Sequence, residues 1–171
     1  MSTVYLSLGT NVGDRWQNLR DAIKSLGGLI QIETVSSIYE TEPWGPVHDQ
    51  PYFLNCCVSG YSDLESEQLL VALKRLEERL GARNVKRWGP RLIDIDVISI
   101  GQVQLTYGRW KLPKPLIETQ AFVLIPLQEI APQWRHPASG CLAEELLQAV
   151  DRRGVVLAGD LYDEEVGALS D

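Results

Sequence analysis

Residues 52–81 read YFLNCCVSGYSDLESEQLLVALKRLEERLG, and this stretch indicates the fold. Its first ten residues are an apolar run of strand-forming types and predict a strand over 52–61. A Ser62-x-x-Glu65 capping box follows, and leucines then recur at helical spacing from Leu69 to Leu80. Gly81 marks the end of that pattern. The stretch therefore predicts a strand followed directly by an amphipathic helix.

The flanking residues complete a β-α-β-β-α-β order. Strands are expected over residues 4–8, 30–41 and 92–100, and a helix capped by Asp14 over 14–26. This order is typical of an α+β fold, the ferredoxin-like sandwich, in which an antiparallel sheet carries both helices on one face. A helix or mixed segment over 119–130 and a short helix over 142–150 would be C-terminal additions.

The length of 171 residues fits one domain, expected over residues 1–150. Residues 151–171 carry six acidic residues against two arginines, a net charge of −4, and predict a loosely attached acidic tail. The sequence has neither a membrane-length apolar run nor a secretory signal pattern. Its three cysteines are an odd number without metal-ligand spacing, so a zinc site is not expected and a reducing, cytoplasmic location is.

The charge distribution suggests a small anionic ligand. A net charge of −7 argues against a general nucleic-acid binder. Seven of the sixteen basic residues nevertheless lie between Lys74 and Arg91. This basic segment is consistent with a polyanionic small molecule, and equally with a solvated helix face.

Two aspartates are the strongest chemical signal. In the segment RWGPRLIDIDV, residues 87–97, Asp94 and Asp96 share one strand face, with carboxylates roughly 6–7 Å apart. Ile98 and Ile100 are expected to continue that face as buried residues. Such a carboxylate pair suits Mg²⁺ that bridges phosphate oxygens, although a D-x-D pattern alone also fits the solvent side of a strand.

Neighbouring arginines favour the phosphate interpretation. Arg83, Arg87 and Arg91 precede the aspartates closely, and guanidinium groups grip phosphate through paired hydrogen bonds. We therefore expect cations and metal ligands to converge at the start of this strand.

A second group of residues suits a flat heterocycle. The proline-rich loop over 42–51 would hold Trp44, and Phe53 and Asn55 share a strand face after it. Aromatic rings can stack on a heterocycle, and an amide can both donate and accept at its edge. The alternative is that Trp44 and Phe53 are ordinary hydrophobic residues.

Five segments together resemble the 6-hydroxymethyl-7,8-dihydropterin pyrophosphokinase family of folate biosynthesis. They are LGTN (8–11), VSSIYET (35–41), QPYFLN (50–55), RWGPRLIDID (87–96) and FVLIPLQEIAP (122–132). The resemblance implies a ferredoxin-like fold and an enzyme that uses two Mg²⁺ ions. It also implies transfer of the pyrophosphoryl group of ATP to the pterin hydroxymethyl oxygen, with release of AMP.

The resemblance also implies roles by position. The metal ligands would be Asp94 and Asp96, and the catalytic residues Arg83, Arg91 and Asp96. ATP would be bound by Glu77, Trp88, Arg91, Arg109 and Lys114. The pterin would be bound by Thr41, Pro43, Trp44, Phe53, Asn55 and Phe122. The partners would be these two small molecules, with no nucleic acid or membrane, and the chain is expected to be a monomer.

Three positions depart from the family pattern. In the loop after the second helix the family has two arginines, and only one of them, Arg83, is clearly retained here. Lys114 stands where the family has a histidine, and Gln120 stands where it has an arginine. We expect redistributed ATP contacts, with Lys114 a weak phosphate contact. Two alternatives are a degenerate member that binds pterin without efficient transfer, and an RNA-binding β-α-β-β-α-β module. The second fits poorly because aspartates on a central strand repel phosphate unless metal is present.

Overall fold

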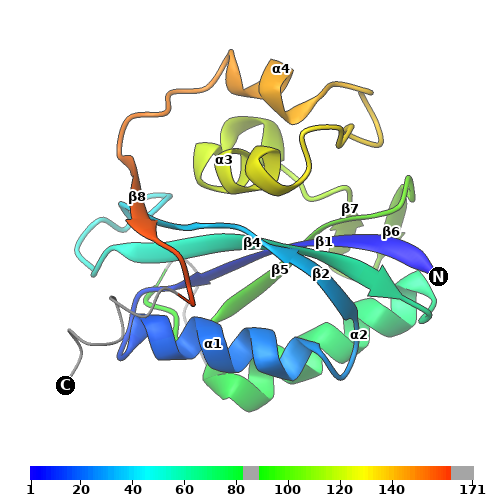
Figure 1. Ribbon diagram of the computed structural model, residues 1–171, viewed down its shortest axis with the longest axis horizontal. Coiled ribbons are helices and arrows are strands. Elements are labelled where there is room, and N and C mark those ends of the chain that lie inside the picture. The colour runs from blue at the N-terminus through cyan, green and yellow to red at the C-terminus, as the bar shows by residue number, and fades with distance from the viewer. Residues whose placement is uncertain (83–88, 163–171) are drawn as a thin grey trace.

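The computed structural model describes residues 1–82 and 89–162 and shows a three-layer α/β/α arrangement (Figure 1). The sheet has the order β5-β1-β4-β3-β8, with β2 also paired to β4, and all of its pairings are antiparallel. Its strands are β1 (Ser2–Thr10), β2 (Gln31–Val35), β3 (Ile38–Thr41), β4 (Phe53–Ser62), β5 (Asp94–Ile100) and β8 (Val155–Gly159). A hairpin of β6 (Leu105–Tyr107) and β7 (Trp110–Leu112) lies apart from this sheet.

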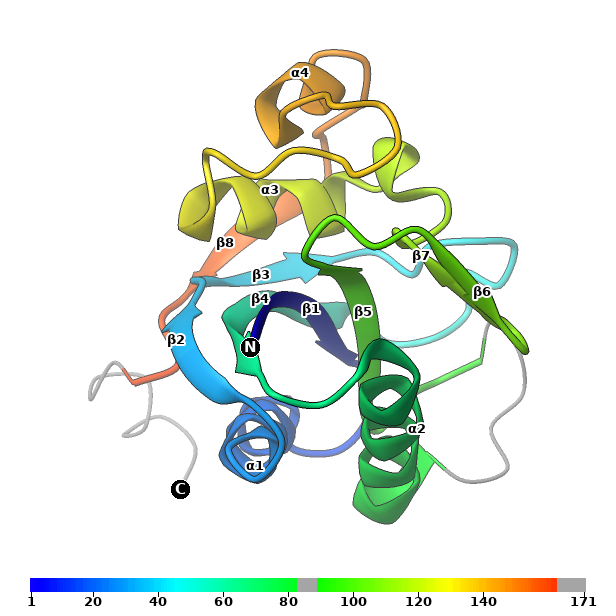
Figure 2. The same ribbon diagram turned by 90° about the vertical axis from the view of Figure 1, so that its right-hand side faces the viewer.

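The predicted ferredoxin-like order is confirmed. Helices α1 (Arg15–Leu26) and α2 (Ser66–Glu77) cover one face of the sheet, as Figure 2 shows from the side. The C-terminal additions α3 (Ala121–Ile130) and α4 (Ala143–Leu147) cover the other face. None of the described helices is both long and apolar enough to cross a membrane.

Each face of the sheet has its own hydrophobic cluster. Leu6, Leu19 and Leu73 belong to the cluster under α1 and α2, and Ile98 and Leu124 to the cluster under α3 and α4. The two adjacent cysteines of β4 divide between these clusters, because neighbours on a strand point to opposite faces. They are therefore free thiols, as the sequence predicts.

Two local predictions were wrong. The single strand expected over 30–41 is two strands, interrupted where the Ser36 hydroxyl accepts a hydrogen bond from the Cys57 N–H at 2.9 Å. The capping box expected at Ser62 lies three residues later, where the Gln68 side chain accepts from the Glu65 N–H. Ser62 instead ends β4, and its hydroxyl donates to the Leu29 carbonyl. The Cys57–Ser36 and Ser62–Leu29 hydrogen bonds join residues far apart in the sequence, so local patterns do not predict them.

The segment after residue 150 contributes a strand. β8 pairs with β3 at the edge of the sheet, and Leu161 beyond it is buried. The Ser37 hydroxyl donates to Asp160, and the Ser37 N–H donates to Glu129 of α3 at 2.7 Å. The expectation of a loosely attached segment from residue 151 did not anticipate this strand. The domain boundary at residue 150 stays a prediction, and residues 163–171 lie outside the described part.

The sheet requires glycine at position 60, because a side chain there would clash with the backbone of β2. A Cβ there would lie 2.4 Å from the Gln31 carbonyl oxygen, which is backbone and cannot move aside cheaply. We expect Gly60→Ala to lower the free energy of unfolding by about 1–3 kcal/mol, measured by urea denaturation. The control is Gly28→Ala, whose Cβ would approach only the Ser25 carbonyl, at 3.6 Å. Equal stability of the two variants would show that β2 and β4 are less closely packed than described.

Candidate active site

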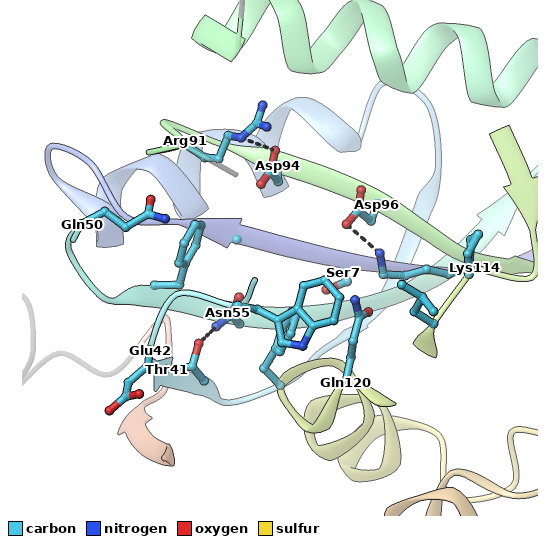
Figure 3. Close-up of a pocket in the computed structure, with 17 residues that line it drawn as sticks. Ser7, Thr41, Glu42, Gln50, Asn55, Arg91, Asp94, Asp96, Lys114 and Gln120 are labelled. Atoms are coloured by element: carbon cyan, nitrogen blue, oxygen red, sulfur yellow. Dashed lines mark hydrogen bonds and ion pairs between the residues drawn. The ribbon is translucent and has the colours of Figure 1, made fainter. Parts of the chain in front are cut away.

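A pocket of about 420 Å³ opens over the sheet beside the start of α3 (Figure 3). The strand register brings its floor together: Gly9 of β1 is paired with Asp94 on one side and Asn55 on the other, and Ser7 is paired with Asp96. The pocket is lined by Ser7, Gly9, Thr41, Glu42, Trp44, Gln50, Phe53, Asn55, Gly89, Arg91, Asp94, Asp96, Lys114, Pro115, Leu116, Gln120 and Phe122. Residues from distant parts of the chain therefore meet on one surface.

The two aspartates lie on this floor, each facing a cation. The Arg91 Nε is 3.9 Å from Asp94 Oδ1, and the Lys114 Nζ is 3.0 Å from Asp96 Oδ2. Burial, and next the charge of Asp96, raise the pKa of Asp94 to about 7, although Arg91 acts in the opposite direction. An additional positive charge beside this carboxyl group would stabilise its ionised form.

The prediction that Ile98 and Ile100 continue the strand face of the aspartates was correct for Ile98 and wrong for Ile100. Ile98 belongs to the cluster under α3, on the same side as the pocket, but Ile100 belongs to the cluster under α1 and α2. The register of β5 against β1 shifts between the Val97–Leu6 and Ser99–Tyr5 pairs. Such a bulge moves every later side chain to the opposite face, so strict alternation fails after it.

Glu77 does not line the pocket, although the resemblance implies an ATP contact for it. Its side chain is buried beneath β5, where Oε2 accepts a 2.8 Å hydrogen bond from the Ile95 N–H. Its Oε1 accepts from the Lys74 ammonium at 2.7 Å. Because Ile95 stands between the two aspartates, this bond fixes the backbone that carries both of them.

The other half of the pocket is aromatic and amide. The buried Asn55 amide donates to the Thr41 hydroxyl at 2.6 Å, which fixes the plane of the amide. The Trp44 and Phe122 rings lie 6.4 Å apart at a tilt of 54°. A Cβ on Gly9 would come within 3.1 Å of Asn55 Oδ1, so glycine there leaves room for the amide. This half can receive a flat molecule and read its edge.

Asn11 holds together the two segments that flank the pocket. Its side-chain amide donates to the Gln50 side chain and to the Pro51 carbonyl, at 3.0 and 2.8 Å. Its Oδ1 accepts from the Arg91 N–H at 2.7 Å. The proline-rich loop and the segment before β5 are thereby joined to the end of β1. The sequence motif LGTN contains Asn11, but no role was predicted for this residue.

Most of the predicted site residues meet in this pocket, with five exceptions, of which Glu77 is described above. Pro43 is buried between the lining residues Glu42 and Trp44, and Arg109 lies on the β6–β7 turn over the Trp110 ring. Arg83 and Trp88 lie outside the described residues. Ser7, Glu42, Gln50 and Gln120 line the pocket without a predicted role. Only the pairing of β1 with β5 would have revealed Ser7.

The donor set fits Mg²⁺. Two carboxylates on one strand face are hard oxygen ligands, and their mutual repulsion is relieved by a cation. Within residues 1–82 and 89–162, no three His, Cys, Asp or Glu side chains gather around a common point. The aspartates would therefore supply a minority of the ligands, as is usual where Mg²⁺ binds phosphate and water as well.

An antiparallel α+β sandwich whose pocket combines a carboxylate pair, cations and an aromatic wall is the arrangement of a phosphoryl-transfer enzyme. Residues 5–132 match the model of the 7,8-dihydro-6-hydroxymethylpterin-pyrophosphokinase (HPPK) family. The chain belongs to this family.

Curated relatives agree. The 2-amino-4-hydroxy-6-hydroxymethyldihydropteridine pyrophosphokinase of Synechocystis sp. is 37% identical over 172 residues, covering 95% of this chain and 87% of the relative. The protein of the same name from Methylorubrum extorquens is 38% identical over 157 residues, covering 91% and 98%. That from Aquifex aeolicus is 38% identical over 137 residues, covering 80% and 85%.

Solved structures support the fold. A crystal structure of wild-type Plasmodium falciparum HPPK-DHPS superimposes with a TM-score of 0.68 at 15% identity. The match covers 86% of this chain and 44% of that one, so the present chain spans less than half the length of the solved protein. A structure of HPPK-DHPS in complex with substrates gives the same TM-score at 13% identity, covering 86% and 43%.

Family membership confirms the predicted function. The chain is an ATP-dependent pyrophosphokinase of folate biosynthesis that transfers the pyrophosphoryl group of ATP to hydroxymethyldihydropterin. This result favours the enzyme over an RNA-binding module of the same strand order.

The buried contact of Glu77 generates a test. Glu77→Ala leaves the Ile95 N–H without its acceptor, so we expect the free energy of unfolding to fall by roughly 1–3 kcal/mol in urea denaturation. Because the aspartates flank Ile95, turnover should fall as well, with little change in the KM for ATP. The half-exposed neighbour Glu78, changed to alanine, serves as the control. A large rise in the KM for ATP at unchanged stability would instead support the ATP contact that the resemblance implies.

Proposed function

We propose that Asp94 and Asp96 hold two Mg²⁺ ions during pyrophosphoryl transfer from ATP. The first support is that both carboxylates line one face of the pocket. The second is that the pKa of Asp94 is raised to about 7, although Arg91 and Lys114 act to lower it. Bound Mg²⁺ would neutralise the oligophosphate and make its β-phosphorus easier to attack. The other side chains of the pocket would bind the pterin and the triphosphate.

The aromatic half is proposed to bind the pterin. Phe122 and Phe53 line the pocket and would stack on the ring, while Asn55 and the Thr41–Trp44 backbone would read its edge. Because Thr41 already fixes the Asn55 amide, the amide would need no reorientation on binding. The substrate hydroxyl would thereby be held toward the aspartates.

The cationic half is proposed to bind the triphosphate. The backbone of Arg91 makes two hydrogen bonds with Asn11, one with its backbone and one with its side chain, and the Arg91 Nε lies 3.9 Å from Asp94 Oδ1. In the transfer, the pterin oxygen forms a bond to the β-phosphorus while the bond from that phosphorus to the AMP oxygen breaks, and the hydroxyl proton is released. Arg91 would stabilise the charge that develops, and no covalent enzyme intermediate is needed.

Some predicted features remain part of this proposal. Arg83 keeps its predicted catalytic role, Trp88 and Arg109 keep their predicted contacts with the nucleotide, and Lys114 keeps its predicted phosphate contact. A monomeric state and a cytoplasmic location likewise stay predictions. For Glu77 we propose a positioning role behind β5 in place of direct ATP contact.

The metal pair is tested by Asp96→Asn, which removes one charge at nearly constant volume. We expect turnover to fall about 100-fold or more, measured as AMP formed from MgATP in the presence of hydroxymethyldihydropterin. Asp63→Asn, at an exposed aspartate beyond β4, should behave as wild type. Near-normal turnover in Asp96→Asn, with the fold intact by circular dichroism, would refute the assignment.

The pterin side is tested by Asn55→Leu. Loss of the edge-reading amide should raise the KM for the pterin roughly tenfold or more, while the KM for ATP stays close to wild type. Thr41→Val removes only the hydroxyl that orients the amide, so a smaller rise is expected. If Asn55→Leu raised the KM for ATP and spared that for the pterin, the two halves of the pocket would be assigned the wrong way round.

A further inference from the structure

Lys114 is fixed in position against Asp96. Its Nζ lies 3.0 Å from Asp96 Oδ2, and its side chain is only 15% exposed, while that of Asp96 is 52% exposed. Its backbone N–H donates to the Ile98 carbonyl at 2.8 Å, which anchors the lysine two residues beyond its partner on β5. The ammonium therefore forms an ion pair with the carboxylate that binds the metal in the proposed function.

Gln120 presents a buried oxygen without a partner. Its residue is 5% exposed, and among the buried side-chain nitrogen and oxygen atoms that the structure describes, only Oε1 of Gln120 lacks a hydrogen bond. Gln120 lines the same pocket as Lys114, and Figure 3 shows its side chain directed toward the part of the pocket that the lysine reaches. A buried acceptor of this kind is unfavourable until a donor arrives.

We infer that Lys114 is a resident counter-cation of Asp96 which a divalent ion displaces, and that Gln120 Oε1 accepts the displaced ammonium. The inference rests on the proposed function, because it takes Asp96 as a metal ligand. An ammonium and a divalent ion repel each other and compete for the same carboxylate oxygen, so they do not share it at contact distance. An ammonium released into a partly buried pocket needs a new acceptor, and Gln120 supplies one.

Two consequences distinguish this arrangement from a passive ion pair. Divalent ions bind more weakly than the two aspartates alone would allow, because each binding event must break the Lys114 contact. Metal binding also moves a positive charge within the pocket, away from Asp96 and toward the start of α3, where it can meet an anionic ligand.

The experiment is calorimetric titration of the whole protein with Mg²⁺, first alone and then with α,β-methylene-ATP. We expect Lys114→Met to tighten Mg²⁺ binding at least fivefold, whereas Lys114→Arg, which keeps a resident cation, stays within twofold of wild type. Lys111→Met, at an exposed lysine on β7, is the matched control and should have no effect. Thermal unfolding of each variant verifies that it is folded.

The role of Gln120 is tested in the same titration by a double-mutant cycle. Gln120→Met should weaken Mg²⁺ binding several-fold when Lys114 is present and leave it unchanged in the Lys114→Met background, because no ammonium is then displaced. Equal effects in both backgrounds would overturn the acceptor role of Gln120. Unchanged affinity in Lys114→Met would overturn the counter-cation role, and absence of Mg²⁺ binding in every variant, with and without the nucleotide analogue, would overturn the metal site itself.

Discussion

Two carboxylates of like charge on one face of β5 impose the main constraint on this structure. Their repulsion and partial burial are unfavourable, and the pKa of Asp94 at about 7 expresses that cost. The surrounding chain compensates from several directions: Arg91 approaches Asp94, and Lys114 approaches Asp96. Glu77 fixes the backbone between them from the opposite face of the sheet. The site therefore depends on the position of β5 more than on any single pocket residue.

The central strand β1 sets that position. Gly9 and Ser7 pair with the aspartates on one side and with β4 on the other, so one register aligns the carboxylate side and the aromatic side of the pocket. Asn11, one residue beyond the strand, then ties both flanking segments to its end. Because these contacts involve backbone pairing and one buried amide, the two halves of the pocket keep a fixed separation before any substrate binds.

The sequence contained the element order and the aspartate pair because both depend on local periodicity. It did not contain features that arise from long-range pairing. The bulge that turns Ile100 to the opposite face depends on β1, and the strand β8 depends on an open edge at β3. Glu77 reads as one more charge on a helix, and its buried contact appears only when α2 packs beneath β5. Gln120 was noticed as a departure from a family pattern, but its unpartnered oxygen could be recognised only in three dimensions.

The central claim is that the two aspartates hold divalent metal at this end of β5, and paramagnetic broadening tests it most directly. Mn²⁺ added with α,β-methylene-ATP to ¹⁵N-labelled protein should broaden the amide signals of Asp94, Asp96 and their neighbours Gly9 and Ile95, because Gly9 is paired with Asp94 and Ile95 stands between the two aspartates. Amides of β2, outside the pocket, should stay sharp. Broadening centred elsewhere in the chain, with the Gly9 and Ile95 signals unaffected, would contradict the account.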